Sequence, residues 1–370
     1  MTKTPILQFG TSRFLQAHAD LFVSQAREEG QEVGPITIVQ SSGDASRAAR
    51  LRAFARPFPV RIEGLINGAR VQKTITVGSV ARGVSTSQDW AEVARIFVEE
   101  AQIVLSNTGD RGFAARDSDH LDAFDQSMSY PAKLTHLLRI RFARGAAPIQ
   151  IMPMELVPNN GQVLKARVMD LAKADPPGFR TYLDTGVTWV NSLVDRIVSQ
   201  PIEPVGAVAE PYALWAIEDQ PGLIAPCIHP AIQIVPSLDQ IEALKLFVLN
   251  LSHTFLAERW LWSNGSDGRL VREMMEDLSE LARLQALIIN EVRPAFVAAG
   301  LTDAFDAYLE TTLERFANPY LDHRIADIAQ NHPQKVARRM GGFLDFAARH
   351  GDHGDKPILS RIMMQHRETV

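Results

Sequence analysis

The chain has 370 residues, of which 46% are hydrophobic, and a formal net charge of −5 from 38 basic and 43 acidic residues. A typical domain holds roughly 100 to 200 residues, so this length indicates two domains. The charges are spread along the chain without a basic stripe, which argues against a nucleic-acid partner and favours a small-molecule ligand.

The cysteine content and the hydropathy of the sequence indicate the cellular compartment that suits the protein. Cys227 is the only cysteine, so the chain can form neither an intramolecular disulfide nor a thiolate metal cluster, which fits a reducing cytoplasm. The amino terminus lacks the features of a signal peptide, and no apolar run approaches the roughly 18 residues that span a bilayer. We therefore expect a cytoplasmic protein without a membrane partner, as a monomer or small homo-oligomer.

The first part of the sequence alternates between short apolar runs and helical patterns. Such alternation is typical of a parallel sheet covered by helices on both faces, and it predicts a Rossmann-type doubly wound α/β domain over residues 1–236. The strands are predicted at residues 5–10, 35–40, 101–107 and 148–156, and the helices at residues 13–28, 44–55, 131–143 and 161–172.

The sequence pattern changes between Ser199 and Pro236. This segment is rich in prolines and contains short extended stretches at residues 207–217 and 231–236. From residue 237 onward the patterns are helical, so we predict an all-α domain over residues 237–370 that carries substrate and catalytic groups. The helices are predicted at residues 238–261, 268–299, 303–317, 323–330 and 335–350.

The strand-to-helix junction "FGTSRFLQAH" is the first candidate site. Rossmann domains hold a pyrophosphate at this position on backbone N–H groups. Gly10 suits the tight turn, but Ser12 and Leu15 stand at the second and third glycine positions of the G-x-G-x-x-G fingerprint. A nucleotide site and an ordinary turn both remain open. For the nucleotide site we expect contacts from Gly10, Thr11, Ser12, Arg13 and Phe14.

Two later segments add candidates for nucleotide binding. Asp44, after the second strand, would suit the ribose of NAD, whereas Ser42 and Arg47 would suit the 2′-phosphate of NADP. Asn107 and Thr108, in "SNTGDRG", follow a later strand at the edge where such folds bind ligands, although a plain turn explains this segment equally well. The expected cofactor is NAD or NADP, with NAD favoured.

The stretch "KLFVLNLSH" places three polar residues among large apolar ones. On an ideal α-helix Lys245, His253 and Asn250 fall at roughly 0°, 80° and 140°, and apolar side chains cover the other directions, so burial is predicted nearly all round. One explanation is a packing surface with satisfied polar groups. The other is a site for carbonyl–alcohol interconversion without a metal, in which a desolvated lysine exchanges a proton and the amide stabilises an alkoxide.

Other polar clusters in the sequence are expected to be surface features. "RHGDHGDK" carries His350 and His353, but its glycines prevent a rigid ligand geometry. "DSDHLDAFD" reads as a surface turn followed by a helix start, and the HExxH, P-loop and GxSxG motifs are missing from the sequence. We therefore predict no metal site.

The spacing K-x4-N-x2-H, downstream of "FGTSRFLQAH", resembles the polyol-specific long-chain dehydrogenases, the mannitol dehydrogenase family. The resemblance continues in chain order through "SNTGDRG", "SYPAKLTHLL", "PMELVPNNG", "NSLVDRIV", "AEPYALWAIED" and "RFANPYLDHRIADIA". It is strongest to the tagaturonate reductase (altronate oxidoreductase) branch, in "SYPAKLT", "MELV" and "NPYLDH". It implies a Rossmann domain followed by a helical domain, with NAD(P) and without zinc.

The resemblance also implies roles for individual residues. Lys245 would be the general acid/base, Asn250 an oxyanion contact, and His253 the group that places the reacting oxygen. Asp195 matches a family acid near the substrate and Asn191 precedes it, although a salt bridge and a helix cap are their structural alternatives. An acidic substrate also needs a cation, for which the candidates are His323, Arg324, Arg338, Arg339 and Lys133.

Two departures from the family pattern bear on the function. Leu156 stands where mannitol enzymes carry a second oxyanion asparagine, which argues against mannitol, and Ser12 and Gln16 replace the usual glycine and arginine of the nucleotide loop. We predict an NAD(P)-dependent oxidoreductase that interconverts a keto sugar acid or ketose and its alcohol. The alternatives are a mannitol or polyol 2-dehydrogenase, an NAD-using epimerase or oxidoisomerase, and a catalytically silent nucleotide-binding protein.

Overall fold

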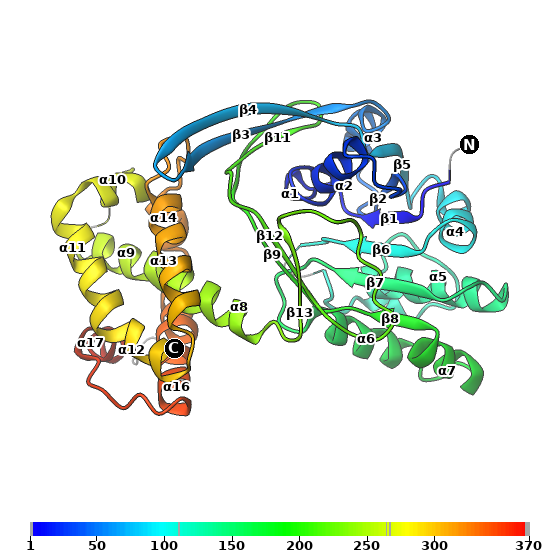
Figure 1. Ribbon diagram of the computed structural model, residues 1–370. Coiled ribbons are helices and arrows are strands. Elements are labelled where there is room, and N and C mark those ends of the chain that lie inside the picture. The colour runs from blue at the N-terminus through cyan, green and yellow to red at the C-terminus, as the bar shows by residue number, and fades with distance from the viewer. Residues whose placement is uncertain (1–2, 110–111, 264, 266–267, 367–370) are drawn as a thin grey trace. The chain divides into compact units, whose positions relative to one another are not determined.

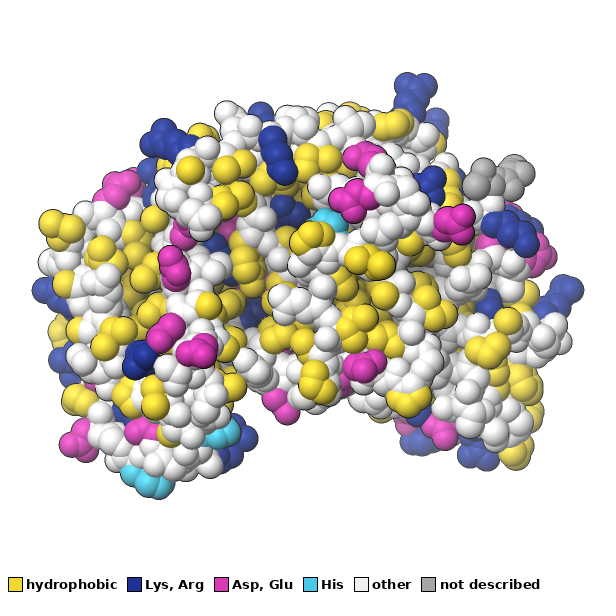
Figure 2. Space-filling view, viewed as in Figure 1, with side chains coloured by type: hydrophobic (Ala, Val, Ile, Leu, Met, Phe, Trp, Pro, Cys, Tyr) yellow, Lys and Arg dark blue, Asp and Glu magenta, His cyan; other side chains and the backbone are white. Residues whose placement is uncertain are grey.

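The computed structural model describes residues 3–109, 112–263, 265 and 268–366 (Figure 1). The chain divides into two compact units. The sheet unit comprises residues 1–62 and 73–238, and the helical unit comprises residues 63–72 and 239–370. Among the described residues no helix is both long and apolar enough to cross a membrane. Basic and acidic side chains are interspersed on the face drawn in Figure 2.

A six-stranded sheet forms the centre of the sheet unit. Its order is β5-β2-β1-β6-β7-β8, and each neighbouring pair is parallel. This is the strand order of a doubly wound Rossmann sheet, with its switch point between β1 and β6, so the predicted fold class is confirmed. The strands are β1 (Ile6–Phe9), β2 (Ile36–Gln40), β5 (Val80–Ser85), β6 (Ile103–Ser106), β7 (Ile149–Pro153) and β8 (Val187–Trp189).

The central strand β1 is buried on both faces. Leu7 and Phe9 point into one hydrophobic cluster and Ile6 points into another, because neighbouring residues of a strand face opposite sides. Helices contribute apolar side chains to both clusters, and each cluster has its own set of helices. The first contains α4 (Trp90–Glu99), α5 (Tyr130–Ala143), α6 (Asn160–Leu171) and α7 (Pro177–Thr185), and the second contains α1 (Arg13–Gln16), α2 (Ala19–Glu28) and α3 (Ala48–Ala53).

The continuous helix predicted over residues 13–28 is wrong, because the chain leaves the helix between α1 and α2. His18 is buried at φ −128° and ψ −96°, and it donates from Nε2 to the carbonyl oxygen of Leu214 at 3.0 Å. Arg196 donates from Nη1 to the carbonyl of Ala17 at 2.6 Å. These long-range hydrogen bonds stabilise the break against the local helical preference.

The other strands among the described residues form two smaller sheets. The four-stranded sheet has the order β10-β11-β3-β4, and the three-stranded sheet has the order β13-β12-β9. Their strands are β3 (Phe58–Ile66), β4 (Ala69–Val77), β9 (Ser192–Asp195), β10 (Val198–Pro201), β11 (Ala207–Ala209), β12 (Leu214–Glu218) and β13 (Ile232–Val235). The β3–β4 hairpin is not among the elements predicted from the sequence, although Asn67 and Gly68, both at positive φ, form the Asn-Gly turn typical of hairpins.

The tip of that hairpin, residues 63–72, belongs to the helical unit. The N–H of Gly68 donates to a carboxylate oxygen of Glu314 at 2.7 Å, and the side-chain amide of Asn318 donates to the carbonyl of Glu63 at 3.3 Å. The rest of this unit is helical, as predicted. Its α-helices are α8 (Asp239–Leu244), α9 (Leu251–Trp262), α10 (Val271–Glu276), α11 (Leu278–Leu287), α12 (Arg293–Ala298), α13 (Thr302–Phe316), α14 (Ile325–Ile328), α15 (His332–Val336), α16 (Gly342–Arg349) and α17 (Pro357–His366).

The long helices predicted in this unit are interrupted. Asp277 separates α10 from α11, because its carboxylate accepts hydrogen bonds from the N–H groups of Ser279 and Glu280 and so caps α11. Among the described residues of this unit three π-helical turns widen the helices, and neither these turns nor α17 is predicted from the sequence. The π-turns lie at Lys245–Asn250, Ile288–Val292 and Ala337–Gly341.

A polar pair is buried between β1 and α2. Gln8 and Asp20 are fully buried, and neither carboxylate oxygen of Asp20 has a hydrogen-bond partner among the described residues. Burial raises the pKa of Asp20 to about 8. The nearby Gln8 amide offsets part of this rise, although its geometry falls short of a hydrogen bond. The carboxyl group is therefore mostly protonated at neutral pH.

We expect Asp20→Asn to stabilise the protein at about pH 8 and to change it little at about pH 4. A carboxyl group with a raised folded-state pKa contributes stability below its unfolded value of 3.8, and loses it as the pH rises through about 8. Each unit of that shift corresponds to about 1.4 kcal/mol. Thermal unfolding of both proteins across this range, with the exposed Asp303→Asn as control, measures the effect. A difference that is independent of pH would contradict the assignment.

Candidate active site

A cavity of about 480 Å³ lies at the carboxyl ends of β1, β2 and β6. Strands β1 and β6 are the neighbours between which the winding of the sheet reverses, where doubly wound sheets bind nucleotides. Most of the residues predicted to contact the cofactor line this cavity: Gly10, Thr11, Ser12, Arg13, Ser42, Asn107 and Thr108. The other two, Phe14 and Asp44, are outside its lining.

Packing and local hydrogen bonds explain the positions of these two side chains. The Phe14 ring stacks on His18 with the ring centroids 4.8 Å apart and packs against the core. The carboxylate of Asp44 accepts hydrogen bonds from the N–H and hydroxyl of Ser46 and pairs with Nε of Arg47 at 3.0 Å. Asp44 therefore closes the turn before α3.

The loops after β1 and β6 approach each other closely at Gly10. This residue has φ +133°, and a Cβ atom there would lie 2.7 Å from the carbonyl oxygen of Asn107, so only glycine fits without strain. The Asn107 amide donates to the carbonyl of Met154 at 2.9 Å. Thr108 donates from its N–H and hydroxyl to the buried carboxyl group of Glu155 at 3.0 and 2.9 Å. These bonds hold the second loop in place.

The two residues that depart from the family pattern help to organise the first loop. Ser12 accepts a hydrogen bond from the N–H of Leu15 at 3.2 Å and so caps α1. Gln16 is buried, donates to the carbonyl of Thr11 at 3.2 Å, and accepts from the N–H of Gly206 at 2.7 Å. Side-chain hydrogen bonds therefore shape the loop where the family has a glycine and an arginine.

The cavity is basic. Its described lining includes five cationic side chains and no acidic one, the cations being Arg13, Arg47, Arg50, Arg116 and Lys133. Arg13 and Arg47 pair with the carboxylates of Glu203 and Asp44 at 2.5 and 3.0 Å. The other three donate to main-chain carbonyls, which carry no formal charge: Arg50 to Thr11, Arg116 to Ser127, and Lys133 to Ser41.

The cationic side chains of the cavity repel one another, and this repulsion helps to lower the pKa values of two of them. Burial, aided by the charge of Arg116, lowers the pKa of Lys133 to about 8. Burial and the charges of Arg13 and Arg47 also lower the pKa of Arg50. An anion in the cavity would relieve this repulsion, so the lining suits the phosphates of a dinucleotide. Lys133, considered above for a substrate carboxylate, belongs to this cavity.

In the helical unit, Lys245 and Asn250 are the first and last residues of a π-turn. The N–H of Leu251 donates to the carbonyl of Leu246, which is an i→i+5 hydrogen bond. A turn closed by i→i+5 hydrogen bonds holds more residues than an α-helical turn, so Lys245 and Asn250 lie nearer to the same side of the helix than they would on an α-helix. His253, three residues further on, stays near that side. The angles predicted for an ideal α-helix are wrong, because the widened turn groups the three residues more closely.

The burial predicted for this helix is confirmed in part. The apolar residues Phe247, Val248, Leu249 and Leu251 are buried, and so is His253. Lys245, Leu246 and Asn250 are half-buried. The polar residues at the two ends of the π-turn therefore retain partial access to solvent.

His253 has one open hydrogen-bonding position. Its ring stacks on Phe316 at a centroid distance of 4.3 Å and meets His323 edge-on at 4.9 Å. Its Nε2 has no hydrogen-bond partner among the described residues. Burial, followed by the charges of His323 and Arg339, holds the pKa of His253 well below its ordinary value. The ring is therefore neutral at physiological pH, with Nε2 able to bond a ligand oxygen.

Arg339 links two π-turns. From Ala337–Gly341 it donates through Nη1 to the carbonyl of Asn250 at 3.2 Å and to the hydroxyl of Thr254 at 2.9 Å. The Thr254 hydroxyl donates in turn to the carbonyl of Asn250 at 3.0 Å. These bonds satisfy a carbonyl at the end of the widened turn, and burial lowers the pKa of Arg339 to about 10.

The remaining predicted substrate residues lie in different places. Asn191 is in the sheet unit, where its amide donates to Glu218 at 2.6 Å and accepts from the N–H of Gln162 at 3.1 Å, which caps α6. Asp195 is buried at the end of β9, also in the sheet unit. Arg324 is exposed in the helical unit.

The fold and its basic cavity are those of a Rossmann-type nucleotide-binding domain, and the sequence profile identifies the family. The profile of the mannitol dehydrogenase Rossmann domain matches residues 4–226, and that of the mannitol dehydrogenase C-terminal domain matches residues 237–351. The chain belongs to the mannitol dehydrogenase family. It is a dehydrogenase or reductase that acts on CH–OH groups.

Curated relatives include several named altronate oxidoreductase. The chain is 28% identical to the one from Halalkalibacterium halodurans, over 94% of this chain and 72% of the relative. It is 27% identical to the one from Bacillus subtilis, over 96% of this chain and 78% of the relative. The resemblance to the altronate branch is therefore confirmed at the level of sequence similarity.

Solved structures show the same fold. A substrate-free D-sorbitol dehydrogenase superposes with a TM-score of 0.77 at 20% identity, over 94% of this chain and 77% of that chain. The Pseudomonas fluorescens mannitol 2-dehydrogenase, in a ternary complex with NAD and D-mannitol, superposes with a TM-score of 0.72 at 16% identity, over 99% of this chain and 84% of that chain.

We expect Gly10→Ala to weaken NADH binding by roughly tenfold or more, a loss of at least about 1.4 kcal/mol. A Cβ atom at Gly10 would push the first loop away from the carbonyl of Asn107. Gly30→Ala is the matched control, because Gly30 also has a positive φ, +85°, but has nothing within 4 Å of an added Cβ. Fluorescence titration with NADH measures both variants, and equal affinities would contradict the assigned role of the close approach.

Proposed function

We propose that this protein is an NAD(P)-dependent reductase that interconverts a keto sugar acid and its hydroxy acid, as tagaturonate and altronate are interconverted. The main support for this proposal is that Lys245, Asn250 and His253 lie toward one side of the helix. Nε2 of His253 is open for a ligand there, and basic groups are close by. The relatives named altronate oxidoreductase, which align over more than 90% of the chain, support this substrate class.

Each of the three polar residues has a distinct part in the proposed reaction. When bound, the nicotinamide supplies the hydride that adds to the substrate carbonyl carbon. Lys245 gives a proton from Nζ to the carbonyl oxygen, so that an alcohol forms and the neutral amine regains its proton from solvent. The amide N–H of Asn250 stabilises the developing alkoxide. Nε2 of the neutral His253 bonds the same oxygen and orients it.

The surroundings of His253 favour an acidic substrate. The largest charge effects on its ring come from His323, Arg339, Arg315 and Lys335. Burial lowers the pKa of His323 itself, so the positive charge at neutral pH comes mainly from the two arginines and the lysine. Arg339 and Lys335 donate to uncharged oxygens in the contacts described, Lys335 to the carbonyl of Ile328 at 2.7 Å. A substrate carboxylate would offset this concentration of positive charge, whereas a neutral polyol would not.

The basic cavity supports a nicotinamide dinucleotide as cofactor. The backbone of Gly10, Thr11 and Ser12 and the cations Arg50, Arg116 and Lys133 would hold its phosphates. Asp44 is engaged by Ser46 and Arg47, while Ser42 and Arg47 line the cavity. This arrangement accommodates the 2′-phosphate of NADP as well as NAD.

Asn191 and Asp195 lie just before β9 and at its end, in the sheet unit, and the family resemblance assigns both to substrate binding. Asn191 is assigned a positioning role, because both ends of its amide are engaged with Glu218 and Gln162. For Asp195 we keep the role that the family resemblance implies, which is an acid near the substrate. Its neighbour Arg196 donates to the carbonyl of Ala17 and so couples this motif to the helix break that follows the nucleotide loop.

The activity is tested with a panel of keto sugar acids, sugar acids and polyols, each incubated with NADH or NADPH in reduction and NAD or NADP in oxidation. We expect a change in nicotinamide absorbance with a sugar acid pair. Lys245→Ala should lower turnover by a factor of roughly a hundred or more, the usual contribution of a general acid, with NADH affinity unchanged. The exposed Lys73→Ala is the control.

Three outcomes would contradict the proposal. Full turnover in Lys245→Ala would remove the lysine from the mechanism. Conversion of substrate without net NADH change would indicate an epimerase or oxidoisomerase. NADH binding without activity on any member of the panel would indicate a silent nucleotide-binding protein.

We expect Arg339→Met to raise KM for the sugar acid at least tenfold more than KM for a neutral polyol. Methionine keeps much of the apolar stem but removes the charge that a substrate carboxylate would meet. Arg338→Met is the matched control, because Arg338 lies on the same π-turn but is exposed. An equal effect on both substrates would instead assign Arg339 only to stabilising the carbonyl of Asn250.

A further inference from the structure

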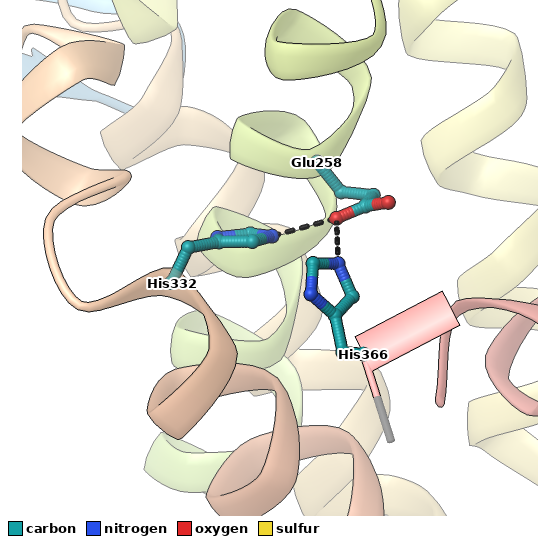
Figure 3. Close-up of side chains that lie close together, drawn as sticks. All are labelled: Glu258, His332 and His366. Atoms are coloured by element: carbon teal, nitrogen blue, oxygen red, sulfur yellow. Dashed lines mark hydrogen bonds and ion pairs between the residues drawn. The ribbon is translucent and has the colours of Figure 1, made fainter. Parts of the chain in front are cut away.

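Three side chains from three helices converge in the helical unit: Glu258 of α9, His332 at the start of α15 and His366 at the end of α17 (Figure 3). Oε2 of Glu258 accepts hydrogen bonds from Nε2 of His332 at 2.7 Å and from Nε2 of His366 at 2.8 Å. One donor atom from each residue lies within 4.8 Å of the other two. No sequence motif predicts this cluster, because its members are far apart in the chain.

The cluster is separate from the residues assigned to the reaction. Glu258 lies five residues after His253 on the same helix, so it points to a different side of α9. Glu258 and His332 are buried, with side chains 7% and 4% exposed, whereas the His366 side chain is 20% exposed. An ion from solvent could therefore reach the cluster past His366.

The donor atoms match the preferences of a transition metal. Two imidazole nitrogens and one carboxylate oxygen form a common ligand set for Zn²⁺, which binds such atoms at about 2.0 to 2.2 Å in tetrahedral geometry. Ligand atoms around such an ion are roughly 3.3 Å apart. The 2.7 and 2.8 Å separations would therefore widen by about half an ångström, a change within reach of side-chain rotation.

The charge state of the carboxyl group is also suitable. Burial alone would raise the pKa of Glu258, but hydrogen bonds from His332 and His366 outweigh it and hold the pKa below its ordinary value. Glu258 is therefore ionised at neutral pH. This single carboxylate would leave a bound divalent ion with one net positive charge, well below that of the bare ion.

We propose that Glu258, His332 and His366 bind one divalent transition-metal ion of the Zn²⁺ type. Three protein ligands leave a fourth position for water. The ion acts as a structural link that joins the end of α17 to α9 and α15. It complements the other end of α17, where the carboxylate of Glu291 accepts hydrogen bonds from the N–H groups of Ile358 and Leu359 at 2.8 and 3.0 Å.

The test uses the untagged full-length chain, stripped of metal with a chelator. Calorimetric titration with Zn²⁺ should give one site per chain and a higher thermal midpoint, and Co²⁺ should give the visible absorption of a tetrahedral nitrogen and oxygen site. His366→Ala and Glu258→Gln should each weaken Zn²⁺ binding at least tenfold. His350→Ala, which removes an exposed histidine of the same unit, should bind as the wild type does.

The partly exposed His366 keeps the test decisive if variants at the buried positions fail to fold. No Zn²⁺ binding by the wild type, or equal binding by folded His366→Ala, would overturn the proposal and leave the three side chains as a hydrogen-bonded cluster. Neither result depends on dehydrogenase turnover, because the readout is metal binding and thermal stability.

Discussion

The close approach of the β1 and β6 loops is the constraint on which the sheet unit's binding site depends. Gly10 leaves no room for a Cβ atom beside the carbonyl of Asn107. Hydrogen bonds from Asn107 to the carbonyl of Met154 and from Thr108 to the carboxyl group of Glu155 hold the second loop in place. Because both loops end parallel strands at the switch point of the sheet, their separation sets the width of the basic cavity.

The helical unit depends on a comparable local departure from regular structure. The π-turn from Lys245 to Asn250 brings residues closer to one side of the helix than an ordinary α-helix would, and Arg339 satisfies a carbonyl at its end. The same arginine contributes to the positive field around His253. A single side chain thus connects the geometry of the proposed catalytic residues with the charge of the substrate they would accept.

Much of the fold was predictable because local patterns and tertiary structure agree. Apolar strands such as residues 5–10 are buried on both faces of the observed sheet. Predictions failed where distant residues decide the backbone, as at His18, whose ring bonds the carbonyl of Leu214 and interrupts a helical pattern. The side chains of Phe14 and Asp44 turn away from the cavity because a ring stack and a local turn compete for them.

The sequence by itself determined the class of fold, the family and the identity of the polar residues at Lys245, Asn250 and His253, because these follow from hydrophobic period and residue order. Only the tertiary structure decided which cations share the nucleotide cavity, how the π-turn groups the three residues, and that Glu258 meets two histidines. The reason is physical. Burial, charge and hydrogen bonding act between side chains that are close in space, and the separation of two residues along the chain does not show whether they are close in space.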